Sequence, residues 1–393
     1  MVGYCTNVHP GVTLGQIKQN LDRESLEVKW RVSPDQPMGI GLWLSSTATE
    51  ELMDRDTRFQ FRDWLLQREL VPYTVNAFPA GDFHQAVVKH DVYQPTWAEH
   101  SRMDYTNRVA TILTDLLPRG TRGTISTLPL GWPTATAQGS DSTTSQEFLQ
   151  ACSRHLMQTV NVLADLEETQ DIHLRLCIEP EPGCILDTCD DVVHYFDRYL
   201  FRSDLSQTAR ERAGRHLGVC HDICHSAVMF EPQAVALDRY AQADIPVGKV
   251  QVSSAIEVNF DSMDESATAD ALAQLATFAE PRYLHQTSIL ANDGVEYFSD
   301  LPLALDSIGT EKPAGTWRVH FHVPIHEPSF GLIHSTQAQI LECAAWFKAA
   351  QQTSVHFEVE TYAWNVLPES LQPERLTDGI ASEINWFLSQ FND

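Results

Sequence analysis

The chain has 393 residues, 43% of them hydrophobic, so it is long enough to bury a large core. It carries 53 Asp and Glu against 27 Lys and Arg, for a formal net charge of -26. Nucleic acids and anionic membranes require clustered basic residues, so this charge argues against both as partners. No export signal and no run of 18 apolar residues is visible, and the eight cysteines lack the density of a disulfide scaffold. We therefore expect a cytoplasmic protein without membrane insertion.

Short apolar segments alternate with helical patterns almost from end to end of the chain. This alternation is typical of a parallel sheet. No glycine-rich phosphate fingerprint follows any strand, so a closed (β/α)8 TIM barrel fits better than an open doubly wound sheet. The expected strands are 2–8, 38–45, 71–79, 123–131, 173–182, 216–225, 248–256, 317–326 and 355–364, and the expected helices are 14–29, 48–70, 100–117, 145–169, 231–243, 264–279 and 334–351.

Nine strand candidates exceed the eight of a barrel, so one of them is supernumerary. A further short extended run indicates an inserted extra strand or hairpin near 280–316. We expect a single domain over 1–393, although the length also allows two domains. Long loops at 79–99, 132–146 and 281–315 follow strands, on the rim where barrels carry their function.

Several candidate strands have one apolar face and one face of carboxylates and imidazoles. In HLRLCIEPEPG, Leu174 and Leu176 alternate with polar side chains that end at Glu179, and VHFEVE ends in the same way at Glu360. In WRVHFHV the polar face carries His322. If helices cover the outside of the barrel, these polar faces line its interior.

The polar strand ends favour a divalent metal site. Such a cation needs three or four oxygen and imidazole ligands that converge from different strands. Glu179, Asp222, His322 and Glu360 each lie late in a candidate strand on the expected interior face, so a parallel barrel brings them to one rim. We expect these four residues to bind Mn, Zn, Mg or Co. Glu358 lies one layer deeper than Glu360 and is expected to support the ligands from below.

The alternative is a polar barrel interior that holds no cation. In that case the acidic side chains would pair with the basic side chains of Arg175, Lys249 and Arg318. The run CHDICH resembles half of a structural zinc site, but no second Cys or His pair follows it at ligand spacing, so such a site is not expected.

Three other residues are expected to contact substrate. Glu181 shares the face of Glu179, and His225 follows Asp222 just past its strand. His9 ends the first strand in YCTNVHPG and is expected to serve likewise, unless it is a rim histidine that faces water.

These motifs resemble those of the xylose isomerase-like TIM barrels, which include sugar isomerases, ketose 3-epimerases, inosose dehydratases and endonuclease IV. The wider resemblance is carried by CIEPEP, VCHDICHSA and VHFEVETYAW. More narrowly, YCTNVHPG, GDFHQAVVKHDVYQPTW, STLPLGW and ETYAWNVLP resemble the EboE group of metabolite-traffic proteins encoded in ebo clusters. The resemblance spans nearly the whole chain.

The resemblance to the sugar-acting members implies a metal held by a Glu, an Asp, a His and a second Glu from successive late strands. By motif, Glu179, Asp222 and Glu360 take three of these places, and His225 contacts substrate.

The fourth place departs from the family pattern. Where the seventh strand of the family supplies a ligand histidine, KVQVSSA offers Gln251. Histidines occur instead in the additional runs, at His285 and His322.

The expected function is that of a metal-dependent isomerase or epimerase of a sugar or cyclitol, phosphorylated or not, linked to metabolite biosynthesis or traffic. Glu179 and Glu360 would be the acid and base pair. One alternative is a non-catalytic binding protein that keeps the barrel pocket. Another is a multi-metal phosphodiesterase like the endonuclease IV relatives, which the acidic balance disfavours. The expected partner is a small polyhydroxylated substrate, and the sequence leaves the oligomeric state open.

Overall fold

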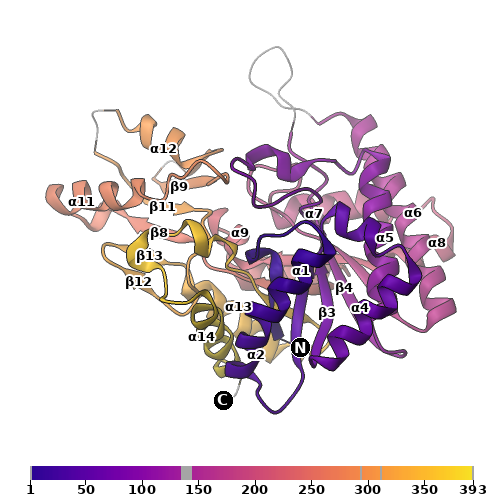
Figure 1. Cartoon of the computed structure of the whole chain (residues 1–393). Helices are drawn as coiled ribbons and strands as arrows, with labels where there is room; N and C mark the ends of the chain where they lie inside the picture. The colour runs from indigo at the N-terminus through magenta and orange to yellow at the C-terminus, as the bar shows by residue number, and fades with distance from the viewer. Residues whose placement is uncertain (1, 134–143, 293, 310–311, 392–393) are drawn as a thin grey trace.

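The computed structural model describes residues 2–133, 144–292, 294–309 and 312–391 (Figure 1). Eight parallel strands close into a barrel in the order β1-β14-β7-β6-β5-β4-β3-β2, so the predicted (β/α)8 barrel is confirmed. These strands are β1 (Val2–Cys5), β2 (Met38–Trp43), β3 (Leu70–Asn76), β4 (Arg122–Thr127), β5 (His173–Ile178), β6 (Leu217–Asp222), β7 (Val247–Val252) and β14 (His356–Val359).

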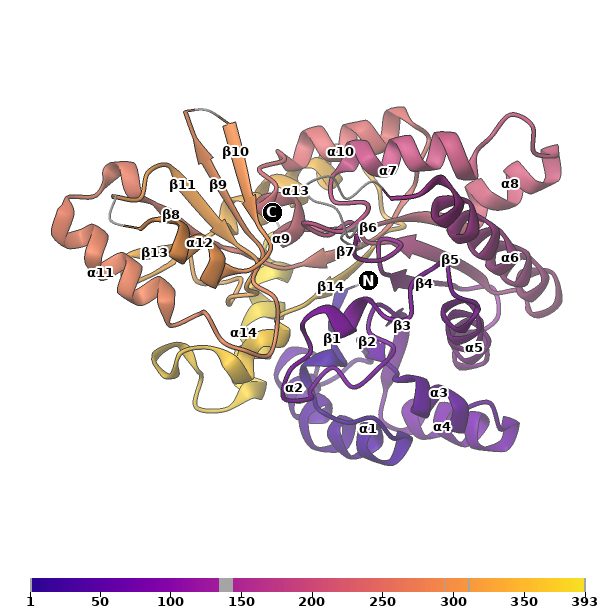
Figure 2. The same cartoon turned by 90° about the horizontal axis from the view of Figure 1, so that it is seen from above.

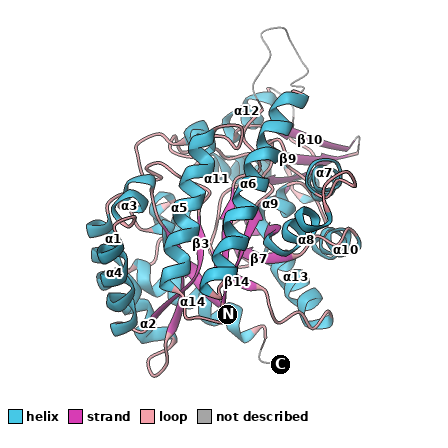
Figure 3. Cartoon of the chain, turned by 90° about the vertical axis from the view of Figure 1, so that its right-hand side faces the viewer, coloured by secondary structure: helices cyan, strands magenta, loops and turns pink. Residues whose placement is uncertain are grey.

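Helices cover the outside of the barrel (Figure 3). All six residues of β2 are buried, as expected for a parallel strand between a helical layer and a packed interior. None of the described helices is both long enough and apolar enough to cross a membrane. The helices of the barrel layer are α1 (Leu14–Asn20), α2 (Leu26–Val32), α3 (Ser46–Glu51), α4 (Arg55–Gln67), α5 (His100–Leu116), α6 (Gln146–Gln170), α7 (Cys189–Tyr195), α8 (Gln207–His216), α9 (Ile223–Val228), α10 (Gln233–Gln242), α13 (Gln337–Ala349) and α14 (Leu376–Ser389).

Local sequence explains where the longest helix starts and stops. The Ser145 side chain accepts a hydrogen bond from the backbone N–H of Phe148 and so caps α6. At the other end Asp171 adopts a left-handed conformation with φ of 60°, which terminates the helix just before β5. The helix therefore ends two residues before β5, the strand that Glu179 directly follows.

A second, antiparallel sheet is inserted between β7 and β14 and lies beside the barrel (Figure 2). Its strand order is β10-β9-β11-β8-β13-β12, and helices α11 (Glu265–Ala276) and α12 (Leu301–Ser307) accompany it. The insertion is thus larger than the predicted region 280–316. Its strands are β8 (Ile256–Asn259), β9 (Thr287–Ala291), β10 (Gly294–Phe298), β11 (Thr316–Val319), β12 (Ser329–Phe330) and β13 (Ile333–Ser335).

The supernumerary strand is the one in WRVHFHV. The prediction that this segment lines the barrel is wrong, because β11 pairs antiparallel with β8 and β9 in the second sheet. After Val319 the chain leaves that sheet and crosses to the barrel, where Val323 N–H donates to Ser254 O at 3.1 Å. This crossing supports our proposal of one domain over 1–393.

The three predicted rim loops have different outcomes. Loop 79–99 lines part of the cavity described below. Region 281–315 contains strands β9 and β10 of the second sheet and the helix α12. Most of loop 132–146 lies outside the described residues.

A buried ion pair fills the barrel interior one layer below the rim. Lys249 Nζ lies 2.6 Å from Glu358 Oε2, and both side chains are fully buried. Lys249 also donates to Ser126 Oγ at 3.0 Å. On β2, a Cβ atom at Gly41 would overlap the Glu358 carboxylate, so glycine at this position makes room for the pair.

We predict that Gly41→Ala destabilises the protein by about 3 kcal/mol or more, because the new methyl group displaces Glu358 and leaves Lys249 unpaired in the interior. Urea denaturation followed by circular dichroism measures the change. Gly81→Ala is the matched control, because a Cβ at Gly81 meets no atom within 4 Å. Equal stability of the two variants would contradict this role of Gly41.

Candidate functional site

A cavity lies at the end of the barrel where the strands finish, and about 530 Å³ of space within it is partly open to solvent. The barrel strands contribute side chains just at or past their carboxyl ends, and loop 79–99 and the insertion supply the rest. The lining residues are Asn7, Asn76, Phe78, Pro79, Phe83, Val88, Lys89, Val92, Tyr93, Glu179, Glu181, His225, Tyr283, Leu284, His320, His322, Glu360 and Tyr362.

Three buried carboxylates, here called the cavity floor, gather at this end of the barrel; Glu179 and Glu360 line the cavity, and Asp222 lies beside them outside the lining. Glu179 directly follows β5, Asp222 ends β6, and Glu360 directly follows β14. Each offers an oxygen, and these oxygens lie within 4.8 Å of one another. The exposed fractions of the three residues are 3%, 2% and 5%, so water screens their mutual repulsion poorly.

Neighbouring side chains hold two of these carboxylates in place. Asn7 and Asn76 donate amide hydrogens to Glu360 Oε1 at 2.7 and 2.8 Å. Ser253 Oγ donates to Asp222 Oδ1 at 2.7 Å. The sequence reasoning missed these three residues. Asn76 ends β3, so the strand-end position that singled out the glutamates could also have found it.

The histidine predicted as a ligand reaches the site from the insertion and not from a barrel strand. His322 lies beyond the end of β11, and a ring nitrogen of His322 lies within 4.8 Å of ligand atoms of Asp222 and His225. Its Nδ1 donates to the backbone oxygen of Glu360 at 2.6 Å. Gln251 instead is fully buried in β7, outside the residues that line the cavity.

The predicted ligands present acceptor atoms that lack hydrogen-bond partners. Glu179 Oε2, Asp222 Oδ2 and His322 Nε2 are all buried and unpaired in the described structure. Buried acceptors of this kind are costly unless something positive satisfies them. An oxygen-rich set with one imidazole suits a divalent cation. Glu179, Asp222 and Glu360 form one such group, and His322 joins Asp222 in a second group with His225, so binding of one cation by Glu179, Asp222, His322 and Glu360 stays a prediction.

The basic residues of the competing hypothesis are engaged elsewhere. Lys249 pairs with Glu358, and Arg318 Nε lies 2.7 Å from Glu257 Oε2 in the second sheet. Arg175 donates to the backbone oxygen of Arg215 at 3.1 Å. Within the described parts of the chain, none of the three forms an ion pair with a carboxylate of the cavity floor.

Burial and like charges set the protonation of the carboxylates. Burial, together with the charges of Asp222 and Glu358, raises the pKa of Glu360 from its ordinary value of 4.5 to about 8. Burial and the charges of Glu360 and Asp222 raise the pKa of Glu179 well above its usual range. Burial opposes the ionisation of Asp222, but His225 and His322 keep its pKa below the ordinary value.

Two of the predicted substrate-binding residues also line the cavity. Glu181 accepts hydrogen bonds from Tyr93 Oη at 2.7 Å and from Gln286 Nε2 at 2.8 Å. His225 Nδ1 donates to the Pro180 backbone oxygen at 2.8 Å.

His9 does not line the main cavity. It is buried behind the first strand, with Nε2 3.0 Å from Tyr4 Oη, and borders a separate small cavity. The prediction that His9 contacts a substrate in the main cavity is therefore corrected, because the chain turns this ring back toward Tyr4.

Loop 79–99 and the insertion together cover one side of the cavity. The backbone N–H groups of Val88 and Lys89 donate to Arg282 O at 2.7 and 3.0 Å, and Tyr283 Oη donates to Phe83 O at 3.1 Å. Among the described residues that line the cavity, Lys89 is the only lysine or arginine, and it forms an ion pair with Asp300.

No protein-family model matches the chain, and no curated protein matches its sequence. Solved structures do resemble the fold. A xylose isomerase-like TIM barrel protein from Mycobacterium smegmatis, in complex with magnesium, aligns with a TM-score of 0.50 and 9% identity, over 99% of this chain and 95% of that one.

Two further structures are similar at lower scores. An L-ribulose 3-epimerase aligns with a TM-score of 0.48 and 9% identity, over 99% and 93% of the two chains. The IOLI protein with a bound zinc atom aligns with a TM-score of 0.47 and 10% identity, over 99% and 96%. At 9% identity the likeness to the Mycobacterium smegmatis protein shows the fold alone: like that xylose isomerase-like TIM barrel protein, this chain forms a (β/α)8 barrel.

Proposed function

We propose that this protein is a divalent-metal-dependent isomerase or epimerase of a small polyhydroxylated molecule, a sugar or a cyclitol. One observation carries the proposal: Glu179 Oε2, Asp222 Oδ2 and His322 Nε2 are buried without a hydrogen-bond partner in the described structure, and Glu179 and His322 line the cavity. Glu179, Asp222, His322 and Glu360 would hold the cation, which when bound would supply positive charge beside the substrate oxygens.

Glu179 and Glu360 would exchange protons with the substrate. They directly follow β5 and β14, strands separated by β6 and β7, so they approach the cavity from two directions. Burial raises the pKa of both glutamates in the metal-free protein, and the bound cation would favour their ionised forms, which can accept a substrate proton. Asn7 and Asn76 fix the Glu360 carboxylate while it gains or loses the proton.

Polar groups of the cavity would orient the substrate hydroxyls. Glu181 would accept a hydrogen bond from a substrate hydroxyl, as it does from Tyr93 Oη. His225 Nδ1 donates to Pro180 O, so Nε2 is the ring nitrogen that would contact substrate. Phosphorylation of the substrate gains no support from the lining, because Lys89 is already paired with Asp300.

We also propose that the protein is of the EboE type and acts in metabolite biosynthesis or traffic. The motifs YCTNVHPG and ETYAWNVLP support this assignment. The structure places part of each beside the cavity, at Asn7, Glu360 and Tyr362.

We predict that the metal-free protein loses stability as the pH rises from about 4.5 to about 8. In this range the folded protein retains the Glu360 proton that the unfolded chain has released, so the free energy of unfolding falls with pH. Thermal melts after chelator treatment measure the slope. With excess Mn²⁺ the slope should reverse, because the cation favours the ionised carboxylates.

Glu360→Gln is the control for this pH profile, because it removes the titrating proton and keeps an amide of similar shape. Its metal-free profile should be flatter than that of the wild type, and Mn²⁺ should raise its Tm less. Identical profiles for the two proteins would contradict the raised pKa of Glu360.

We predict proton exchange at a substrate carbon. Candidate ketoses and inososes incubated in deuterated water with Mn²⁺ or Co²⁺ should take up deuterium beside the carbonyl group, as NMR and mass spectrometry detect. Glu179→Gln and Glu360→Gln should each lower the exchange rate by roughly 100-fold or more, the contribution typical of a general acid or base.

His173→Gln is a matched control for exchange, because His173 begins β5 at the opposite end of the barrel and should leave the rate unchanged. If the wild type binds a candidate ketose or inosose and takes up no label from it, the isomerase proposal fails and a non-catalytic binding protein is the better description.

A further inference from the structure

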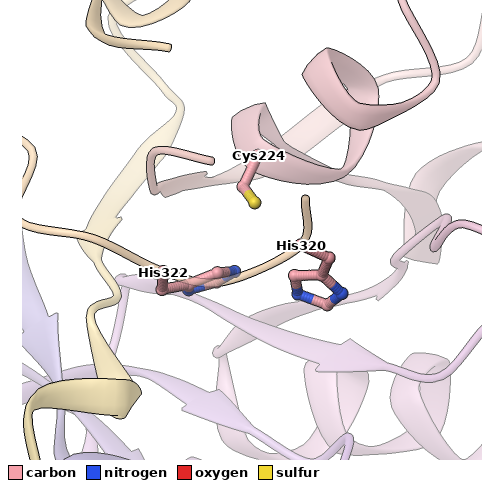
Figure 4. A group of neighbouring side chains, drawn as sticks. All are labelled: Cys224, His320 and His322. Carbon is pink, nitrogen blue, oxygen red and sulfur yellow. The ribbon is translucent and has the colours of Figure 1, made fainter. Parts of the chain in front are cut away.

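Beside the carboxylates, a buried thiol lies next to two imidazoles that line the cavity (Figure 4). Cys224 lies on α9, and His320 and His322 lie on the segment that follows β11. One ligand atom from each lies within 4.8 Å of the other two, and all three side chains are at least 95% buried. In Figure 4 the Cys224 sulfur points toward the two rings.

Hydrogen bonds fix both imidazoles as the tautomer with the proton on Nδ1, which leaves Nε2 free to bind a metal. His322 Nδ1 faces the Glu360 backbone oxygen at 2.6 Å, and a carbonyl oxygen only accepts, so the proton must be on Nδ1. His320 Nδ1 lies 2.8 Å from Gln286 Oε1. The Nε2 atoms of both rings are therefore bare, and both are buried and unpaired in the described structure.

The orientation of Gln286 follows from its other neighbours. Its Nε2 donates to Glu181 Oε1 at 2.8 Å and to Tyr93 Oη at 3.1 Å. The reversed amide would direct an oxygen at the Glu181 carboxylate, so Oε1 must face His320. Outer hydrogen bonds of this kind commonly orient the histidine ligands of metal sites.

We propose that Cys224, His320 and His322 form a second cation site, selective for soft or borderline ions such as Zn²⁺ and Co²⁺. A thiolate with two neutral imidazoles suits these ions, whereas Mg²⁺ and Mn²⁺ prefer the oxygen-rich floor. Binding forms one metal–sulfur and two metal–nitrogen bonds and releases the Cys224 thiol proton to solvent. The fourth position stays open for water or for an oxygen of the substrate.

The two sites compete for one ligand. His322 belongs both to the group with Asp222 and His225 and to the group with Cys224 and His320. Because its Nδ1 is engaged by Glu360 O, His322 has one free nitrogen, Nε2, and can serve only one of the two sites at a time. A hard cation on the floor therefore draws His322 toward the carboxylates, and a soft cation draws it toward the thiol. The identity of the bound ion would set which arrangement the cavity adopts.

Cobalt spectroscopy tests the thiol site in the full-length protein. Chelator-stripped protein, kept reduced without added thiols, is titrated with Co²⁺ while absorption is recorded. Wild type should develop the near-ultraviolet charge-transfer band of a cobalt–thiolate bond. Cys224→Ser should lose this band, and Gln286→Leu should weaken cobalt affinity by roughly 10- to 100-fold, because His320 loses its orienting acceptor.

Two controls separate this proposal from the function proposed above. Cys343→Ser removes a buried thiol on α13 and should keep the band. Glu360→Gln should keep the band as well, although it weakens the effect of Mn²⁺ on Tm. Absence of the band in folded wild type, or its persistence in Cys224→Ser, overturns the thiol site. Loss of Mn²⁺ binding or of deuterium exchange bears only on the carboxylate floor.

Discussion

The structure of this cavity depends on three buried carboxylates that form no ion pair with a lysine or arginine of the described residues. Glu179, Asp222 and Glu360 approach within 4.8 Å of one another in a buried space. Like charges at such distances cannot all ionise in a medium of low polarity without a counter-charge. The raised pKa values favour protons on Glu179 and Glu360 in the metal-free protein, and the proposed cation would replace those protons.

The barrel interior keeps the carboxylates of the cavity floor apart from the buried ion pair of Lys249 and Glu358, which lies one layer below them. Lys249 has the charge needed to compensate a floor carboxylate, yet Glu358 holds it one layer down at 2.6 Å. Breaking that pair would leave a charge isolated in the core, which is much more costly than leaving the floor acids protonated. Gly41 makes this layering possible, because any side chain there would occupy the space of the Glu358 carboxylate. The structural ion pair thus keeps the floor free of an internal counter-ion.

The sequence predicted the barrel well because the barrel strands are short apolar runs separated by helical patterns, and several of these runs end at a polar residue. That rule located Glu179, Asp222 and Glu360, since parallel strands bring their ends to one rim. It failed for WRVHFHV, because alternation along a strand is the same whether the strand joins the barrel or another sheet. It was also wrong for His9, whose ring turns back to Tyr4 after the strand ends. Pairing partners and loop directions are tertiary properties that periodicity does not contain.

Gln251 stands in β7 where the resemblance implied a ligand histidine, and the insertion brings histidines to the cavity instead. The seventh strand supplies no histidine to the rim, and the chain instead builds a six-stranded sheet and returns across the cavity with His320 and His322. The segment after β11 is not part of a sheet, so side-chain hydrogen bonds, and not the backbone hydrogen bonds of a strand, position His320 and His322. His322 depends on the Glu360 backbone oxygen, and His320 depends on Gln286, which is itself held by Glu181 and Tyr93. The cavity wall therefore couples the insertion to the barrel through the same residues that would bind a cation. Ordering of the second sheet and formation of a metal site should accordingly stabilise each other, since each fixes the imidazoles that the other requires.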